Sequence, residues 1–182
     1  MNDLVVTAER SRDPKGAPVT VGFARLGALS VRCALGRGGI RVDKAEGDGC
    51  TPAGRFPLRR LFYRPDRVRN LSTRIPMQAL SPADGWCDDP ADSAYNRLVT
   101  LPYAARHEEL WLEDSLYDLV LTIGHNDDPV VPGKGSAVFL HLAKPDYAPT
   151  AGCVAFARPD FIALLEALEP SSRVVIEERV TR

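Results

Sequence analysis

A histidine and a cysteine that lie twelve positions apart are the residues of this chain best suited to chemistry. His141 stands near the end of an apolar run, 136–142, and Cys153 follows a proline-containing loop, directly after Gly152. A thiol needs a base to become a good nucleophile near neutral pH, and imidazole is the side chain best tuned for that task. The spacing suggests a nucleophile–base pair, but by itself it also fits a histidine buried for structural reasons.

The other two histidines give weaker signals. His107 lies in a charged stretch typical of a solvated surface, and His125 follows a predicted strand, where a loop residue is the simpler interpretation. His125, His141 and Cys153 together would supply three zinc ligands. However, the chain contains neither His-x-x-x-His nor Cys-x-x-Cys, the short-range pairs that anchor such sites. We therefore predict no metal site and no cofactor.

The composition is that of an ordinary globular protein with nearly balanced charge. Its 182 residues include 23 basic and 24 acidic side chains, and this formal net charge of −1 gives no indication of a nucleic-acid or membrane-surface partner. No stretch reaches the ~18 consecutive apolar residues of a membrane span, and no signal peptide is visible at the start. We expect Cys33, Cys50 and Cys87 to be small buried residues. Nothing in the sequence predicts the oligomeric state.

Short β-strands separated by turns are the main structural expectation, because 15 prolines and 14 glycines favour turns over long helices. Apolar runs and alternating patterns predict strands at 4–8, 19–24, 29–34, 119–123, 136–142 and 172–177. A clear helix is predicted at 158–168 and a short one at 107–112. Turn chemistry dominates 44–58, and 60–97 is expected to be largely irregular. We therefore predict one mainly β domain with a few helices (α+β) over residues 1–182.

Two segments of the chain resemble a known family. His141, the loop after it and Thr150-Ala151-Gly152-Cys153 look like the active-site signature of L,D-transpeptidases of the YkuD type, which is a histidine, a loop and then Ser/Thr-x-Gly-Cys. Upstream, Thr51-Pro52-Ala53-Gly54-Arg55-Phe56 is similar to a Thr-Pro-x-Gly-x-Phe segment often found in that domain. The strand-like stretch 135–141 also resembles the one that leads to the family histidine. Together these matches run from about residue 30 to 165, which is most of the chain.

The resemblance implies a YkuD-like β-sandwich or mixed-sheet catalytic domain that acts on peptidoglycan stem peptides. Cys153 would form a thioester with a tetrapeptide stem and release D-Ala, with His141 as the proton carrier and the backbone N–H groups of Gly152 and Cys153 as oxyanion donors. An amine of a second stem would give a 3→3 cross-link, and water would give hydrolysis. The resemblance implies a periplasmic or cell-envelope location, while the missing signal peptide leaves the cytoplasm open.

Two departures from the family pattern bear on the substrate. Many members carry histidine where this chain has Ala151, and arginine or asparagine where it has Ala155. Both changes affect how the acyl donor is held, and neither removes the nucleophile or the base. Three alternatives therefore stay open: an L,D-carboxypeptidase, a non-catalytic domain that binds wall peptides, and a cytoplasmic cysteine hydrolase for another amide. The group that orients His141 is also open, between a side chain and a backbone carbonyl.

Overall fold

A mixed β-sheet that closes on itself forms the centre of the molecule, in a computed structural model that describes residues 2–12 and 18–178. Among those residues the sheet has nine strands in the order β11-β12-β13-β3-β2-β1-β14-β6-β7. The first strand of this order, β11, also pairs with β6. This pairing closes the eight strands from β11 to β6 into a barrel, and β7 extends the sheet beyond β6. The strands are β1 (Leu4–Arg12), β2 (Pro18–Leu26), β3 (Leu29–Ala34), β6 (Gly54–Tyr63), β7 (Met77–Ala79), β11 (Leu119–Ile123), β12 (Phe139–Leu142), β13 (Val154–Phe156) and β14 (Arg173–Glu177).

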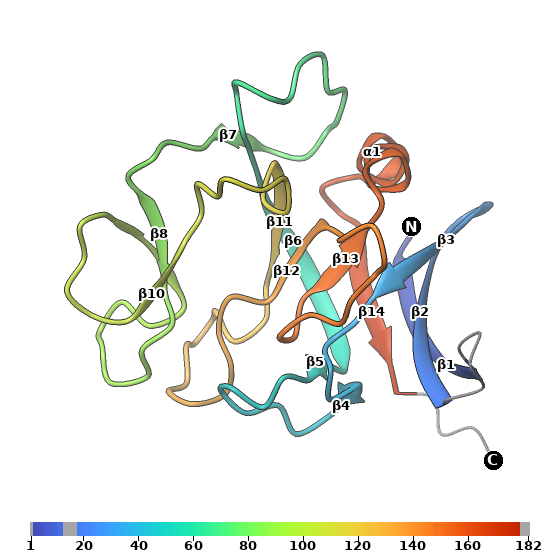
Figure 1. Cartoon of the computed structure of the whole chain (residues 1–182), viewed down its shortest axis with the longest axis horizontal. Coiled ribbons are helices and arrows are strands. Elements are labelled where there is room, and N and C mark those ends of the chain that lie inside the picture. Colours follow the sequence, from blue (N-terminus) through green and yellow to red (C-terminus); the bar gives the residue numbers. More distant parts are fainter. Residues whose placement is uncertain (1, 13–17, 179–182) are drawn as a thin grey trace.

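Two small sheets and one helix complete the described part of the chain. The first small sheet has the order β10-β8-β9, from His107–Glu109, Asp84–Cys87 and Arg97–Thr100. The second pairs β4 (Ile40–Arg41) with β5 (Thr51–Pro52) in parallel. Figure 1 shows β8 and β10 on one side of the barrel and β1 to β3 on the other. The helix α1 (Arg158–Ala167) follows β13, with a proline in its first turn, where the missing N–H costs no hydrogen bond.

The strands β11 and β12 are buried on both faces, which explains their continuous apolar runs. Along β12, Leu140 and Leu142 face the main core inside the barrel, whereas Phe139 belongs to a second cluster. Side chains alternate between the faces of a strand, so His141 lies on the same face as Phe139. That second cluster also contains Cys153. The pattern of β12 thus places the histidine and the cysteine on the same side of the barrel wall.

The mainly β expectation is confirmed, and so are the strands at 119–123 and 136–142 and the helix after Arg158. The helix α1 buries Phe161, Leu164 and Leu165. The strand β12 begins at Phe139 rather than Ser136 because Ala137 has a positive φ of 50° that no strand accommodates.

Two of the predictions from local patterns are wrong. The short helix expected at 107–112 is instead the strand β10, whose backbone pairs with β8 from Cys87 to Gly85. The segments 44–58 and 60–97 contain β5, β6, β7 and β8, although they were expected to form turns and irregular loops. The strands β5, β7 and β8 are only two to four residues long, and β6 contains Gly54 and Pro57, so local patterns do not reveal them. They exist because other segments of the chain pair with them.

Candidate active site

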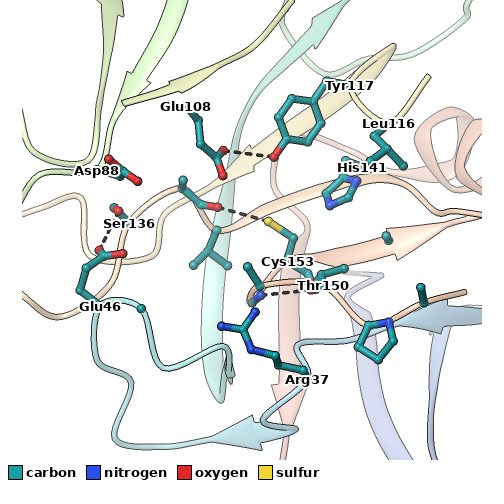
Figure 2. A pocket seen from close by; sticks show the side chains of 18 of the residues that line it. Arg37, Glu46, Asp88, Glu108, Leu116, Tyr117, Ser136, His141, Thr150 and Cys153 are labelled. Atoms are coloured by element: carbon teal, nitrogen blue, oxygen red, sulfur yellow. Dashed lines mark hydrogen bonds between the residues drawn. The ribbon is translucent and has the colours of Figure 1, made fainter. Parts of the chain in front are cut away.

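His141 and Cys153 line the same cavity, which has a volume of about 460 Å³. The strands β12 and β13 run parallel, with His141 opposite Ala155, and Cys153 immediately precedes β13. Figure 2 shows the imidazole ring and the thiol projecting into this space from neighbouring strands. The sequence separation of twelve residues is therefore spanned by one loop between adjacent strands. The structure brings together the two residues predicted to form a pair.

Two backbone groups fix the thiol of Cys153. Its sulfur accepts a hydrogen bond from the Phe139 N–H over 3.3 Å and donates one to the Ala137 carbonyl over 3.2 Å. The left-handed conformation of Ala137 is disfavoured for a residue with a side chain, so its surroundings must hold it in place. The buried side chain of Asn96 does this, because its Oδ1 accepts from the Ala137 N–H over 3.1 Å.

Burial, with a smaller contribution from the carboxylate of Glu108, raises the pKa of the Cys153 thiol to about 12. The Phe139 N–H and the cation of Lys44 act in the opposite direction. The thiol therefore keeps its proton at neutral pH. A thiol becomes a strong nucleophile only when it loses that proton.

A backbone carbonyl orients the imidazole of His141. Its Nδ1 lies 2.9 Å from the Leu142 carbonyl oxygen, which only accepts, so Nδ1 carries the proton and Nε2 is the basic nitrogen. The ring also meets Tyr117 edge to face, with 5.2 Å between the ring centroids. Burial lowers the pKa of His141 to about 4, and the resting imidazole is therefore neutral.

Gly152 holds the backbone in a shape that other residues avoid. Its φ is +147°, and a Cβ added there would lie 2.9 Å from the Cys50 carbonyl oxygen. Its N–H donates to the Thr150 hydroxyl over 3.1 Å. In this structure the Gly152 N–H is therefore directed at Thr150.

The Thr51–Phe56 segment supports the loop that carries the cysteine. The buried Thr51 hydroxyl accepts from the Gly36 N–H over 2.8 Å. Gly36 forms an isolated parallel bridge with Thr150, and the Arg37 N–H donates to the Thr150 carbonyl over 3.0 Å. The backbone of Gly36 and Arg37 therefore connects the two segments that resemble the family.

A family model described as the YkuD L,D-transpeptidase catalytic domain matches residues 9–176. The chain belongs to the YkuD family. Comparisons with curated proteins and with solved structures each found no match. The family is one of L,D-transpeptidase catalytic domains, and its members act on peptidoglycan.

The other two histidines of this YkuD domain lie away from Cys153. The His125 ring lines a separate cavity of about 270 Å³, and its Nε2 lies 3.1 Å from the Lys134 carbonyl oxygen. His107 places Nδ1 2.8 Å from the Ala105 carbonyl oxygen. Within 2–12 and 18–178, no three His, Cys, Asp or Glu side chains are arranged to hold a metal ion. Cys33, Cys50 and Cys87 are buried, as expected, and their thiols are free.

Several charged residues of the cavity were not identified from the sequence. Lys44 and Glu46 come from the loop after β4, and Asp88 follows β8. Glu108 lies on β10, and its carboxylate accepts from the Tyr117 hydroxyl over 3.1 Å. Burial raises the pKa of Glu108 to about 7. No local pattern distinguishes these residues from solvated ones, because they reach the cavity only through the pairing of distant segments.

Both departures from the family pattern, Ala151 and Ala155, line this same cavity. Their methyl groups leave open the space that larger polar side chains would occupy. Arg37, Lys144 and Lys44 supply positive charge on the cavity wall. No helix in the described segments is both long and apolar enough to cross a membrane.

Proposed function

We propose that this YkuD domain is a peptidoglycan L,D-transpeptidase, with Cys153 as the nucleophile and His141 as the proton carrier. The observation that carries the proposal is that both side chains line one cavity, with His141 on β12 and Cys153 directly before the parallel neighbour β13. The fixed sulfur of Cys153 and the unprotonated Nε2 of His141 provide the two groups that acyl transfer to a thiol requires.

The first half-reaction is the attack of Cys153 on the stem tetrapeptide. The thiol proton passes to Nε2 of His141 as the sulfur bonds to the carbonyl carbon that precedes the terminal D-Ala. Because the resting thiol and imidazole are both neutral, we expect this transfer to accompany the attack rather than to precede it. The C–N bond then breaks, and the leaving D-Ala amine takes the proton from His141. A thioester remains on Cys153.

The tetrahedral intermediate carries a negative oxygen that needs fixed donors. The Cys153 N–H is our first candidate, since the Gly152 N–H donates to Thr150 in this structure. Gly152 contributes by permitting the turn and by presenting no side chain to the substrate. In the second half-reaction an amine of another stem attacks the thioester, the C–S bond breaks, and a 3→3 cross-link results. A reaction on peptidoglycan implies action in the cell envelope.

Mass spectrometry of purified muropeptides incubated with the protein tests this function. A cross-linked dimer that is absent with Cys153→Ala supports transpeptidation. A trimmed tripeptide without dimer identifies an L,D-carboxypeptidase, and no change contradicts both. The matched control is Cys87→Ala, because Cys87 is also buried and free but lies on β8, outside the cavity. That variant should retain the activity of the unmodified protein.

A further inference from the structure

Glu108 is the acidic residue of β10 that reaches the cavity of Cys153. Backbone pairing sets Glu108 opposite Trp86 of β8, and the two flanking residues of β10 are His107 and Glu109. Of these three, Glu108 alone lines the cavity, and Glu109 is exposed. Figure 2 shows its carboxylate between Asp88 and Tyr117.

The surroundings of this carboxylate are electrically unfavourable. Its one hydrogen bond in the described structure comes from the Tyr117 hydroxyl, over 3.1 Å. Burial is the largest cause of its pKa of about 7, and the negative charges of Asp88 and Glu46 add to it. Glu108 is half-buried, and a carboxylate withdrawn from water is stable in its charged form only when a cation or several donors compensate it.

No cation of the described residues compensates Glu108. The ion pairs within 2–12 and 18–178 do not include it. Four cations of the described residues line the cavity, and none of them forms an ion pair with Glu108. Arg37 and Lys144 take part in no ion pair of the described residues, and the other two bind other carboxylates. Lys44 binds Asp48 at 2.5 Å, and Arg106 binds Asp88 at 2.9 Å. The site therefore holds a negative group, next to the reacting thiol, whose missing partner is a positive charge.

The second half-reaction of the proposed function brings such a charge. The acceptor is an amine, and a primary amine of lysine type has a pKa of ~10.4, so it arrives as an ammonium ion. It must lose a proton before its nitrogen can attack a thioester. His141 has a pKa of about 4, whereas Glu108 has one of about 7. Glu108 is the better acceptor for that proton.

We propose that Glu108 receives the ammonium group of the acceptor stem and removes one of its protons, so that the neutral amine attacks the Cys153 thioester. This inference rests on the proposed function. One N–H proton passes to the carboxylate, the N–C bond forms, and the C–S bond breaks. A second amine proton returns to the sulfur through Nε2 of His141. Glu108 then loses its proton to water, and both groups are restored.

The test separates the two half-reactions. The acyl-enzyme is first formed with a stem tetrapeptide and then mixed with one of two nucleophiles, and its decay is followed by intact-protein mass spectrometry. The first nucleophile is a stem tripeptide that ends in a diamino acid, and the second is hydroxylamine, which is already neutral at neutral pH. The variant is Glu108→Gln, which keeps the shape of the side chain. Glu109→Gln is the matched control on the same strand.

Glu108→Gln should slow the reaction with the tripeptide by about tenfold or more, which is the size expected when a hydrogen bond to a charged group is lost. Its reaction with hydroxylamine should stay within about twofold of the unmodified protein, and Glu109→Gln should change neither rate. Glu108→Asp, which keeps the charge, should recover part of the tripeptide reaction.

Equal slowing with both nucleophiles would assign Glu108 a structural role and overturn the inference, and so would an unchanged tripeptide rate. If Glu108→Gln does not fold, Glu108→Asp decides the question. A slower reaction with the tripeptide alone supports the inference, and equal slowing with the tripeptide and with hydroxylamine overturns it. Absence of any acyl-enzyme on the unmodified protein would instead contradict the proposed function, and the inference would fall with it.

Discussion

The carbonyl oxygen of Cys50 lies against Gly152, on the side where any other residue would carry its Cβ. This contact joins the residue before the Thr51–Phe56 segment to the residue before Cys153. Position 152 requires glycine for two reasons. Its backbone is left-handed, and the Cys50 carbonyl oxygen fills the space that a Cβ would need. The shape of the loop that carries Cys153 is thus set by a segment about a hundred positions earlier in the chain.

Gly152→Ala should displace the nucleophile. A left-handed conformation costs a residue with a Cβ about 1–2 kcal/mol, and the contact of 2.9 Å adds a clash with backbone that cannot move freely. We expect a loss of stability larger than that conformational cost and a fall in turnover of about 100-fold, measured by urea unfolding and by muropeptide assay. Gly133→Ala is the control, because Gly133 has a φ of +79° and open space around it. Equal effects at both positions would contradict the role of Cys50.

Thr51→Val should weaken the support beneath the same loop. The substitution keeps the shape of the side chain but leaves the buried Gly36 N–H without its acceptor, which lies at 2.8 Å. We expect the free energy of unfolding to fall by about 1–3 kcal/mol, together with reduced turnover. The same change at the exposed Thr100 of β9 should cost little. If Thr51→Val is as stable and as active as Thr100→Val, the segment does not support the site.

His141→Gln should change how stability depends on pH. The pKa of His141 is about 4 in the folded protein and 6.5 in an exposed histidine, so between these values the unfolded chain binds more protons. The free energy of unfolding therefore falls as the pH falls from 6.5 to 4, by about 3 kcal/mol over the whole window, and this contribution is absent above 6.5.

Urea unfolding at several pH values measures that difference. The variant lacks the titration of His141, so relative to the unmodified protein it should gain stability between pH 6.5 and pH 4. The raised pKa of Glu108 makes the free energy of unfolding rise as the pH falls, which is the opposite of the His141 effect. Both proteins contain Glu108, so its contribution cancels in the difference between them. A difference that stays constant with pH would show that His141 is not buried in its neutral form.

The parts of the site that local patterns predict are those with strong sequence signals. The apolar run before His141 predicts a buried strand, and the family signature around Cys153 predicts the loop that returns to it. The structure places both residues on one face of the barrel wall because β12 alternates between two clusters. The strand that carries His141 could thus be predicted from the sequence, whereas β13, directly after Cys153, could not, and the catalytic roles of His141 and Cys153 stay a prediction.

The remaining parts depend on contacts between distant segments. Glu108 reaches the cavity because β10 pairs with β8, a pairing between short strands that no local pattern indicates. Ala137 adopts a left-handed conformation although alanine has no preference for it, and Asn96, about forty positions earlier, holds it there. Such contacts between distant residues outweigh the local conformational propensity, and the neighbouring sequence does not predict them.

Intact-protein mass spectrometry during reaction with a stem tetrapeptide is the most direct test of Cys153 as the nucleophile. We predict a transient adduct equal to the tetrapeptide minus D-Ala on the unmodified protein and on Cys87→Ala, with none on Cys153→Ala. An adduct that persists in Cys153→Ala, or turnover by the unmodified protein that leaves no adduct under rapid acid quenching, would contradict it.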